Sequence, residues 1–290
     1  MCKPHPVIIT RIPDIQGHRG CRGLMPENTI PAFVEAVNLG VSTLEMDVVM
    51  DKDGDLIVSH EPYFNHIFST TPDGKNITKS DEKSHNIFSM TTAEVQMFDV
   101  GLKGNSKFPL QSKIPCYKPT LQEVIDTIEA FTQSSSKSQI KYNIELKYDR
   151  EQVGTFYPQD SVLVKKLLEV LEEKNITSKC TIQSFDPTIL EICKAAKSDI
   201  TIALLIDNHK NLDTNLKSLS FKPNIYSPRH TLVSKSSVAS CHSQNIQVIP
   251  WTVNDEDDLL RLLDCGVDGI ITDYPDKVIE ISQGLLKHPE

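Results

Sequence analysis

The sequence of 290 residues has few aromatic residues and no long apolar run. Its longest apolar stretches, such as residues 7–10 and 269–272, are far shorter than the roughly 20 residues that cross a bilayer. Basic residues are in the minority, because 30 Lys and Arg stand against 39 Asp and Glu, for a formal net charge of −9. Nucleic acid and anionic membranes attract basic surfaces. We therefore expect no nucleic-acid partner and no stable membrane association.

Paired cysteine motifs are also missing. The seven cysteines are scattered singly, without CxxC spacing, and their odd number argues against a disulfide framework. Residues 1–15 contain prolines and a histidine where a secretory signal would need an apolar run of about 7–15 residues. These features predict reduced thiols and a cytoplasmic location.

Short apolar segments alternate with longer amphipathic ones over most of the chain. In residues 161–173 the apolar positions recur at i, i+3, i+4 and i+7, as on one face of a helix. A helix over residues 29–39, with Asn28 as its N-cap, follows the first strand. We expect eight parallel strands, at Asp14–His18, Thr43–Met50, Ile140–Leu146, Cys180–Gln183, Ile200–Leu205, Ile225–Ser227, Gln247–Trp251 and Gly269–Ile271. This α/β pattern predicts a TIM (β/α)8 barrel, with an open doubly wound sheet as the alternative.

One long segment interrupts the alternation. After the second strand, Asp53-Gly54 is a strong turn signal that leads into Leu56-Ile57-Val58, which indicates a hairpin. Residues 61–118 are then polar and rich in Ser, Thr, Asp, Gly and Pro. A connection of that length is too long to be a plain loop. We expect one barrel domain over residues 1–290, with a small insertion subdomain at 61–118 over one face of the barrel.

Polar side chains stand at the predicted carboxyl ends of the first two strands, where a barrel carries its active site. His18 and Arg19 lie between glycines that allow a ligand to come close to the backbone. Glu45 and Asp47 are two residues apart in one strand, so their side chains point to the same side. Two buried carboxylates repel each other, and a divalent cation commonly holds such a pair ionised. The alternative is that both face solvent on an edge strand.

The third strand repeats the pattern. Asn143, Glu145 and Lys147 share one side, where Glu145 can supply a third oxygen ligand and Lys147 a charge for an anionic oxygen. A Glu–Lys ion pair without a ligand is the alternative. His60 follows the hairpin, and a second histidine near His18 would permit acid–base chemistry in both directions. Together these groups indicate a site for a metal-bound phosphate ester.

These residues also carry a family resemblance. The motifs, in chain order, are His18-Arg19-Gly20, Pro26-Glu27-Asn28-Thr29, Glu45-x-Asp47-Val48, Asp53-Gly54, His60, Glu145-Leu146-Lys147, Trp251-Thr252-Val253-Asn254 and Gly269-Ile270-Ile271-Thr272-Asp273-Tyr274-Pro275. In this order and spacing they resemble the glycerophosphodiester phosphodiesterase (glycerophosphoryl diester phosphodiesterase) family over nearly the whole chain.

The resemblance implies a TIM barrel with an insertion after the second strand. It also implies hydrolysis of glycerophosphodiesters, such as glycerophosphocholine or glycerophosphoethanolamine, to glycerol 3-phosphate and an alcohol. By the same pattern, Glu45, Asp47 and Glu145 would hold one divalent cation, Mg²⁺ or Ca²⁺. His18 and His60 would be the catalytic acid–base pair.

The family pattern further implies that Arg19 and Lys147 hold phosphate oxygens. Trp251 would pack against the glycerol or close the pocket, although a place in the core is the alternative. The chain departs from the pattern at Glu61, where many members have Asp, and at Cys21-Arg22, where small residues are common. Neither departure removes a catalytic group.

Two other functions compete with this interpretation. A phospholipase C or D, or a lysophospholipase D, would require an exposed apolar or basic rim for the lipid surface, and we see no such rim in the sequence. A non-catalytic protein that binds phosphate esters would be expected to have lost a histidine or a carboxylate, and none is missing. We therefore expect an enzyme with a small-molecule glycerophosphodiester as its substrate.

Overall fold

The computed structural model of the chain describes residues 8–135 and 139–286. Eight of its strands are parallel neighbours in the order β8-β7-β6-β5-β4-β2-β1-β9. They are β1 (Asp14–Gly17), β2 (Thr43–Met50), β4 (Lys141–Leu146), β5 (Cys180–Ser184), β6 (Thr201–Ile206), β7 (Ile225–Pro228), β8 (Gln247–Val248) and β9 (Gly269–Thr272). The short strand β3 (Leu56–Val58) pairs antiparallel with β2, as the hairpin prediction requires.

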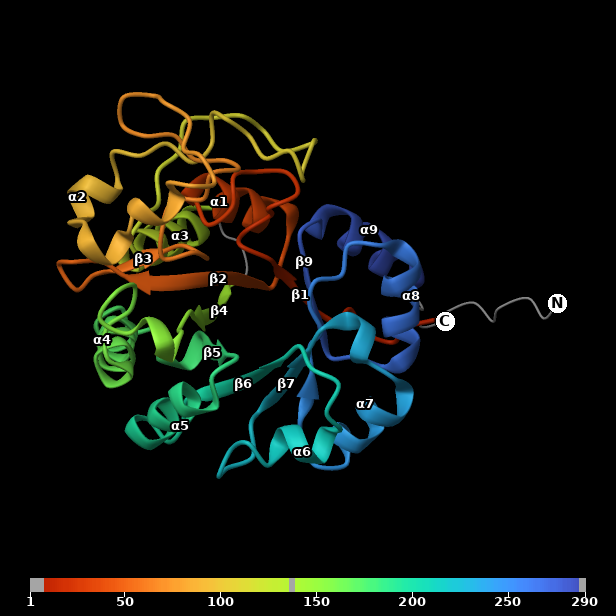
Figure 1. The fold of residues 1–290 in the computed structure, drawn as a ribbon. Helices are drawn as coiled ribbons and strands as arrows, with labels where there is room; N and C mark the ends of the chain where they lie inside the picture. The colour runs from red at the N-terminus through yellow and green to blue at the C-terminus, as the bar shows by residue number, and fades with distance from the viewer. Residues whose placement is uncertain (1–7, 136–138, 287–290) are drawn as a thin grey trace.

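The two ends of this sheet meet each other. The Asp268 N–H donates to the Val248 carbonyl at 2.9 Å, and the Ile271 N–H donates to the Pro250 carbonyl at 3.0 Å. These bonds connect the segment of β8 to that of β9, so the parallel strands form a nearly closed barrel (Figure 1). The predicted TIM barrel is confirmed, and an open doubly wound sheet does not describe this chain.

Helices surround the barrel and follow its strands. They are α1 (Ile30–Leu39), α2 (Thr92–Val95), α3 (Leu121–Ser134), α4 (Asp160–Glu173), α5 (Pro187–Ala196), α6 (Leu212–Leu216), α7 (Lys235–His242), α8 (Glu256–Cys265) and α9 (Pro275–Leu285). Short 3-10 helices lie at Glu82–Ser84, Ile87–Ser89, Arg150–Gln152, Thr177–Lys179 and His230–Leu232. Within residues 8–135 and 139–286, no helix has both the length and the apolar character needed to span a membrane.

Two local expectations differ from the structure. The seventh parallel strand ends at Val248 and not at Trp251, because Pro250 has no N–H to donate to a strand ladder. Backbone bonds to β7 nevertheless continue through the Trp251 N–H. The N-cap of α1 is Thr29, whose side chain accepts from the Ala32 N–H, and not Asn28. Asn28 has a φ of 55° and turns its side chain toward the barrel strands.

Alternation along β2 separates the apolar core from the polar interior. Leu44, Met46 and Val48 belong to the main core between sheet and helices. Glu45 and Asp47 leave the opposite side of the strand and are equally buried. Inside the barrel, Gln183 donates to Glu45 Oε1 at 2.8 Å, so the interior holds satisfied polar groups near the site. The strand thus delivers two carboxylates to the barrel interior while its other face anchors it.

The segment between β3 and α3 has its own apolar cluster. Its buried members from this segment are Phe64, Phe68, Ile77, Ile87, Val95, Phe98, Val100 and Cys116. The Phe64 and Phe98 rings stack with centroids 4.0 Å apart. Val49 and Ile57 from the hairpin join the cluster and connect it to the barrel. In Figure 1 this segment, coloured orange to yellow, lies beside β2, β3 and α1.

The cysteines in the described ranges are free thiols. Cys21, Cys116, Cys180, Cys193 and Cys241 are buried, and Cys265 is half-buried. Burial raises the pKa of the Cys193 thiol to about 12 and that of Cys241 to about 11. Cys2 lies outside the described residues.

Candidate active site

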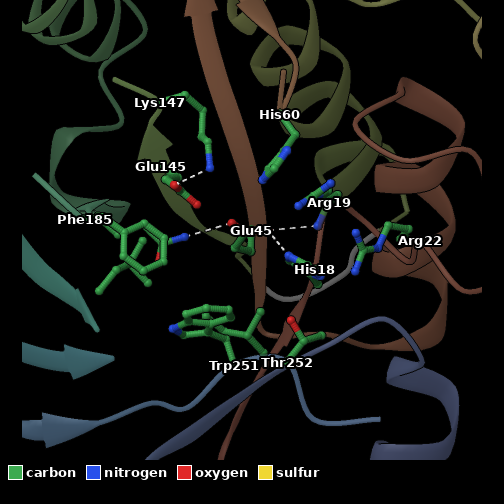
Figure 2. Close-up of a pocket in the computed structure, with 13 residues that line it drawn as sticks. His18, Arg19, Arg22, Glu45, His60, Glu145, Lys147, Phe185, Trp251 and Thr252 are labelled. Atoms are coloured by element: carbon green, nitrogen blue, oxygen red, sulfur yellow. Dashed lines mark hydrogen bonds and ion pairs between the residues drawn. The ribbon is translucent and has the colours of Figure 1, made fainter. Parts of the chain in front are cut away.

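A pocket of about 330 Å³ opens among residues that follow the carboxyl ends of the barrel strands (Figure 2). Every site residue predicted from the sequence lines it except Asp47, which is fully buried. The lining residues are His18, Arg19, Arg22, Glu45, His60, Glu145, Lys147, Gln183, Phe185, Leu205, Trp251, Thr252 and Ile271.

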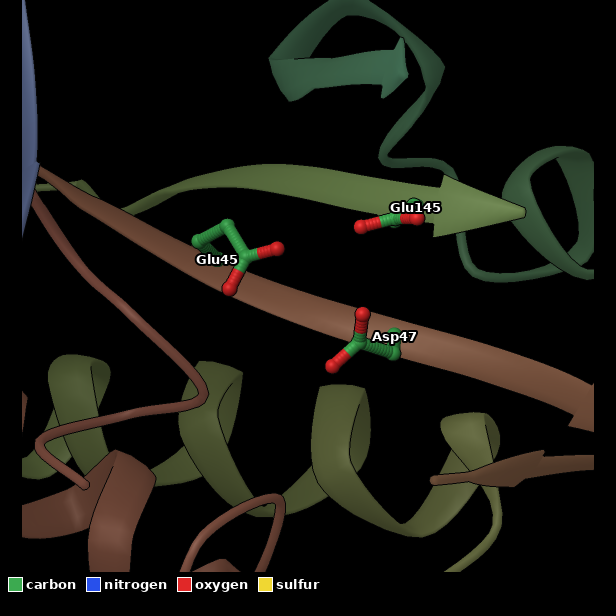
Figure 3. Close-up of side chains that lie close together, drawn as sticks. All are labelled: Glu45, Asp47 and Glu145. Atoms are coloured by element: carbon green, nitrogen blue, oxygen red, sulfur yellow. The ribbon is translucent and has the colours of Figure 1, made fainter. Parts of the chain in front are cut away.

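Three carboxylates form a cluster, and two of them, Glu45 and Glu145, line the pocket (Figure 3). Glu45 and Asp47 come from β2, and the β2–β4 register places Glu145 directly opposite Asp47. One oxygen from each of the three lies within 4.8 Å of the others. Glu45 is only 1% exposed and Asp47 0%, which excludes the alternative of a solvent-facing edge strand.

Each carboxylate is held by neighbours of a different kind. The Arg19 backbone N–H donates to Glu45 Oε2 at 2.9 Å. Asn28 donates to Asp47 Oδ2 at 2.9 Å, and Lys147 donates to Glu145 Oε1 at 2.7 Å. Asp47 Oδ1 is buried and accepts no hydrogen bond from any residue that the structure describes. The Lys147 ammonium lies 3.8 Å from this oxygen.

The three carboxylates of the cluster are buried close together, so each disfavours ionisation of the others, and a bound cation would relieve this repulsion. Burial raises the pKa of Glu45 well above its usual range, and the charges of Asp47 and Glu145 raise it further. Burial also opposes ionisation of Asp47, but Arg19 and other nearby cations hold the pKa of that carboxyl well below its usual range. Three buried carboxylates with one unbonded oxygen fit a hard divalent cation with oxygen ligands.

His18 lies immediately after β1 and contacts Asp273, which lies immediately after β9. Its Nδ1 lies 2.7 Å from Asp273 Oδ1, and its Nε2 lies 3.9 Å from Glu45 Oε2. Burial lowers the pKa of His18 to about 4, and the neighbouring Arg22 guanidinium also lowers it. Although burial opposes its ionisation, the pKa of Asp273 is held well below its usual range by His18 and Arg22. The ionised Asp273 therefore accepts a hydrogen bond from the Nδ1–H of His18, which leaves Nε2 facing the pocket.

His60 has the same arrangement on the other side of the site. Its Nδ1 lies 3.1 Å from Glu61 Oε1. Burial raises the pKa of Glu61, but the hydrogen bond with His60 and nearby cations outweigh it and lower that pKa to about 2. An ionised Glu61 requires Nδ1 to be the donor, so Nε2 of His60 is also the free nitrogen. Figure 2 shows both imidazole rings at the pocket, supplied by different strand ends.

The two predicted phosphate-binding cations lie beside the carboxylates. Arg19, with a φ of 51°, donates to Glu27 Oε1 at 2.7 Å, and its Nε lies 3.1 Å from Asp47 Oδ2. Lys147 bonds Glu145. The ion pair between Glu145 and Lys147 that the sequence offered as an alternative is therefore formed. Glu145 nevertheless also belongs to the cluster with Glu45 and Asp47.

An aromatic pair forms the apolar wall of the pocket. Trp251 and Phe185 meet edge to face, with centroids 5.4 Å apart and planes at 87°. The Trp251 indole N–H donates to the Ser227 carbonyl at 2.9 Å, which fixes the ring. Phe185 is 43% exposed. Trp251 therefore lines the pocket, and it also packs against a small buried cluster of Ala203, Ile225, Ile249 and Ile271.

Several residues of the site were not assigned a role from the sequence. Asp273 holds His18, Glu61 holds His60, Asn28 holds Asp47 and Gln183 holds Glu45. Arg22 makes two bonds to Asp273, at 2.9 and 3.0 Å. The position of Asp273 directly after a barrel strand was a usable signal, because that rule had already located His18.

Comparisons with known proteins agree with this architecture. The sequence profile described as the glycerophosphoryl diester phosphodiesterase family matches residues 18–277. A glycerophosphodiester phosphodiesterase from Caldanaerobacter subterraneus is 28% identical over 268 residues, which cover 91% of this chain and 95% of the relative.

Solved structures show the same fold. A Silicibacter pomeroyi protein assigned to the glycerophosphoryl diester phosphodiesterases superposes with a TM-score of 0.83 at 28% identity, over 97% of this chain and 95% of that chain. A phosphodiesterase from Oleispira antarctica, solved with its product sn-glycerol-3-phosphate, has a TM-score of 0.73 at 22% identity and covers 94% and 97%. The chain therefore belongs to the glycerophosphoryl diester phosphodiesterase family of phosphodiester hydrolases.

Proposed function

We propose that this chain hydrolyses small glycerophosphodiesters, such as glycerophosphocholine or glycerophosphoethanolamine, to glycerol 3-phosphate and the free alcohol. One observation carries the proposal: two imidazoles, two arginines, a lysine and two members of a three-carboxylate cluster line one pocket. The product complex of the Oleispira relative agrees with a pocket for glycerol 3-phosphate. Two histidines that each present Nε2 to the pocket favour a catalyst over a binding protein.

The histidines are proposed to divide the proton transfers. His18, which burial and Arg22 keep neutral, takes a proton on Nε2 from the attacking hydroxyl. That hydroxyl is either the substrate's own 2-hydroxyl, which gives a cyclic phosphate that water then opens, or water directly. His60, paired with Glu61, gives a proton to the oxygen of the departing alcohol. Each histidine reverses its role when the cyclic phosphate is opened.

The remaining groups act on the charge of the phosphate. Arg19 and Lys147 contribute positive charge at the pocket wall for its non-bridging oxygens. Glu45, Asp47 and Glu145 would hold one divalent cation, Mg²⁺ or Ca²⁺, which supplies Lewis-acid neutralisation of the phosphate. Trp251 and Phe185 offer an apolar wall for carbon atoms of the substrate.

Metal removal provides the direct test. The purified protein is stripped with a chelator, and release of glycerol 3-phosphate from glycerophosphocholine is measured before and after Mg²⁺ or Ca²⁺ is returned. We expect turnover to fall at least about 100-fold on stripping, since a bound ion contributes several kcal/mol to such a reaction, and to return with one of the two ions. Full activity in the stripped enzyme would refute the assignment of the carboxylate cluster.

Asp273 gives a second, independent prediction. Asp273→Asn keeps the size of the side chain but replaces the charged acceptor of His18 Nδ1 by an amide. We expect kcat to fall about 100-fold or more, because His18 can then adopt the tautomer that places its proton toward the pocket. Measurement of kcat and KM separates this effect from substrate binding. An unchanged kcat would show that Asp273 does not set the orientation of His18.

A further inference from the structure

One loop of the insertion has a charge opposite to that of the whole chain. Residues 100–122 contain Lys103, Lys107, Lys113 and Lys118 and no acidic residue, although the net charge of the protein is −9. Lys118 is buried, so three lysines of this stretch reach the surface. We call residues 101–116 the basic loop. The overall charge of −9 masks these lysines, which is why no basic rim was recognised from the sequence.

The basic loop is held firmly at its base. Asp99 accepts from the N–H groups of Gly101 and Leu102 through Oδ1, at 3.0 and 2.7 Å, and from Cys116 through Oδ2 at 2.9 Å. The Val100 N–H donates to the Cys116 carbonyl at 2.8 Å. The two ends are therefore fastened together, and the Asp99 charge is occupied by backbone donors. Asp99 therefore does not neutralise the lysines of the basic loop.

The basic loop carries both exposed apolar and exposed basic side chains. Leu102 is 54% exposed and Leu110 is 64% exposed, which places them among the most exposed large apolar residues described. Lys107 and Lys113 are exposed, and Lys103 is half-buried. A hollow of about 470 Å³ in the basic loop is lined by Lys103, Lys113, Asn105, Gln111, Phe108 and neighbouring residues. Exposed leucines beside lysines match the boundary between lipid head groups and acyl chains.

This surface adjoins the mouth of the active site. The Arg22 guanidinium, which lines the catalytic pocket, lies 4.7 Å from the centre of the Phe108 ring. Gln111 of the loop donates to the Arg22 carbonyl at 2.8 Å, and the Ser112 N–H donates to the Leu24 carbonyl at 2.8 Å. In Figure 1 the loop is drawn in yellow, on the side of the barrel where α1 lies. A partner bound to the loop would stand beside the entrance that substrates use.

We propose that the basic loop docks the protein reversibly on an anionic lipid surface. Lysines supply the attraction for acidic head groups, and Leu102 and Leu110 enter the interface. A free anion would give no reason for the exposed leucines. The inference goes beyond the hydrolysis proposed above, because it concerns where the enzyme works: a glycerophosphodiester is the polar part of a phospholipid, and the docked pocket would open beside the surface from which such compounds are released.

Sedimentation with vesicles tests the proposal. We expect the protein to bind vesicles of equimolar phosphatidylcholine and phosphatidylserine at low salt, to bind phosphatidylcholine vesicles far less, and to be released at high salt. The double variant Lys107→Gln and Lys113→Gln is expected to bind about 25-fold more weakly, at about fivefold per lysine. Leu110→Ser is expected to weaken binding with no change in charge.

A matched control uses lysines from the helices. The double variant Lys165→Gln and Lys235→Gln loses the same charge from α4 and α7, where these side chains are 78% and 66% exposed. This control is expected to bind as the wild type does, with circular dichroism used to confirm that each variant is folded. Equal loss in the control, or no binding by the wild type, would overturn the proposal.

Three further outcomes would also overturn it. Inorganic phosphate that binds in calorimetry through the same lysines, with no vesicle binding, would make the hollow a free-anion site. Light scattering that shows dimers dissociated by Lys107→Gln and Lys113→Gln would assign the surface to a second copy. Vesicle binding that Leu110→Ser leaves intact would refute entry into the interface. Because vesicle binding is measured without turnover, its failure leaves the proposed hydrolysis standing, and a failure of turnover leaves the docking standing.

Discussion

Replacing His18 by alanine is expected to lower kcat for glycerophosphocholine by about 10²–10⁴-fold, the range for loss of a positioned acid or base. His60→Ala is expected to have an effect of the same size. The reason is geometric, since each ring has Nδ1 tied to an ionised carboxylate and only Nε2 left for the substrate. The measurement is the rate of glycerol 3-phosphate release at saturating substrate.

Both variants need a histidine control. His242→Ala removes a ring on α7 that is 42% exposed and bonded to Asp268 at 2.8 Å. His242 does not line the pocket. Its kcat should equal that of the wild type. If a folded His18→Ala or His60→Ala enzyme kept kcat within about tenfold of the wild type, below the usual range for such a loss, that histidine would not be the catalytic group.

Glu45→Gln is expected to lower turnover and to remove the response of stability to divalent ions. In the wild type, saturation with the ion to about 100 times its Kd should raise the free energy of unfolding by about 2.7 kcal/mol. The variant keeps the shape of the side chain but loses one of the three charges that attract the ion. We expect kcat to fall about 10²-fold or more and the ion-induced rise in Tm to disappear.

Thermal melts with and without Mg²⁺ or Ca²⁺ measure this effect directly. The control is Glu169→Gln on α4, a carboxylate that is 57% exposed and lies in an exposed pair with Lys165. It should keep the full ion response and normal turnover. An undiminished rise in the Tm of Glu45→Gln would place the ion elsewhere.

The barrel could be predicted because buried strands are recognisable in the sequence as short apolar runs. All residues of β2 are buried, and strands covered on both faces appear in the sequence as nearly continuous apolar runs. Apart from the seventh parallel strand, the expected strand boundaries fall within one residue of those observed. The predicted seventh parallel strand was too long at its carboxyl end, because the apolar run in the sequence continues past Val248 through Pro250. Pro250 interrupts the hydrogen-bond ladder of that strand, since it has no N–H to donate. The role of Asn28 was missed because its αL backbone is set by the turn that precedes α1.

The placement of the candidate site residues was predictable where side chains share a strand. Glu45 and Asp47 needed only the two-residue period of a strand, and Glu145 needed only parallel neighbours. The supporting groups were not predictable in this way. Asp273 meets His18 only because β9 pairs with β1, and Arg22 meets Phe108 only because the insertion folds back over the chain after β1. Such contacts depend on closure of the barrel and on irregular segments that have no periodicity to interpret.

The pairing of β1 with β9 has a consequence for the order in which the enzyme becomes active. His18 lies near the start of the barrel and its partner Asp273 stands 255 residues later. A ribosome therefore delivers the histidine, all three carboxylates and most of the barrel before the group that orients His18 exists. Any chain interrupted before β9 would lack Asp273 and the strand that pairs with β1, so we expect full turnover only once the last strand is in place. Activity in a translation reaction would thus report barrel completion rather than the mere presence of the catalytic residues.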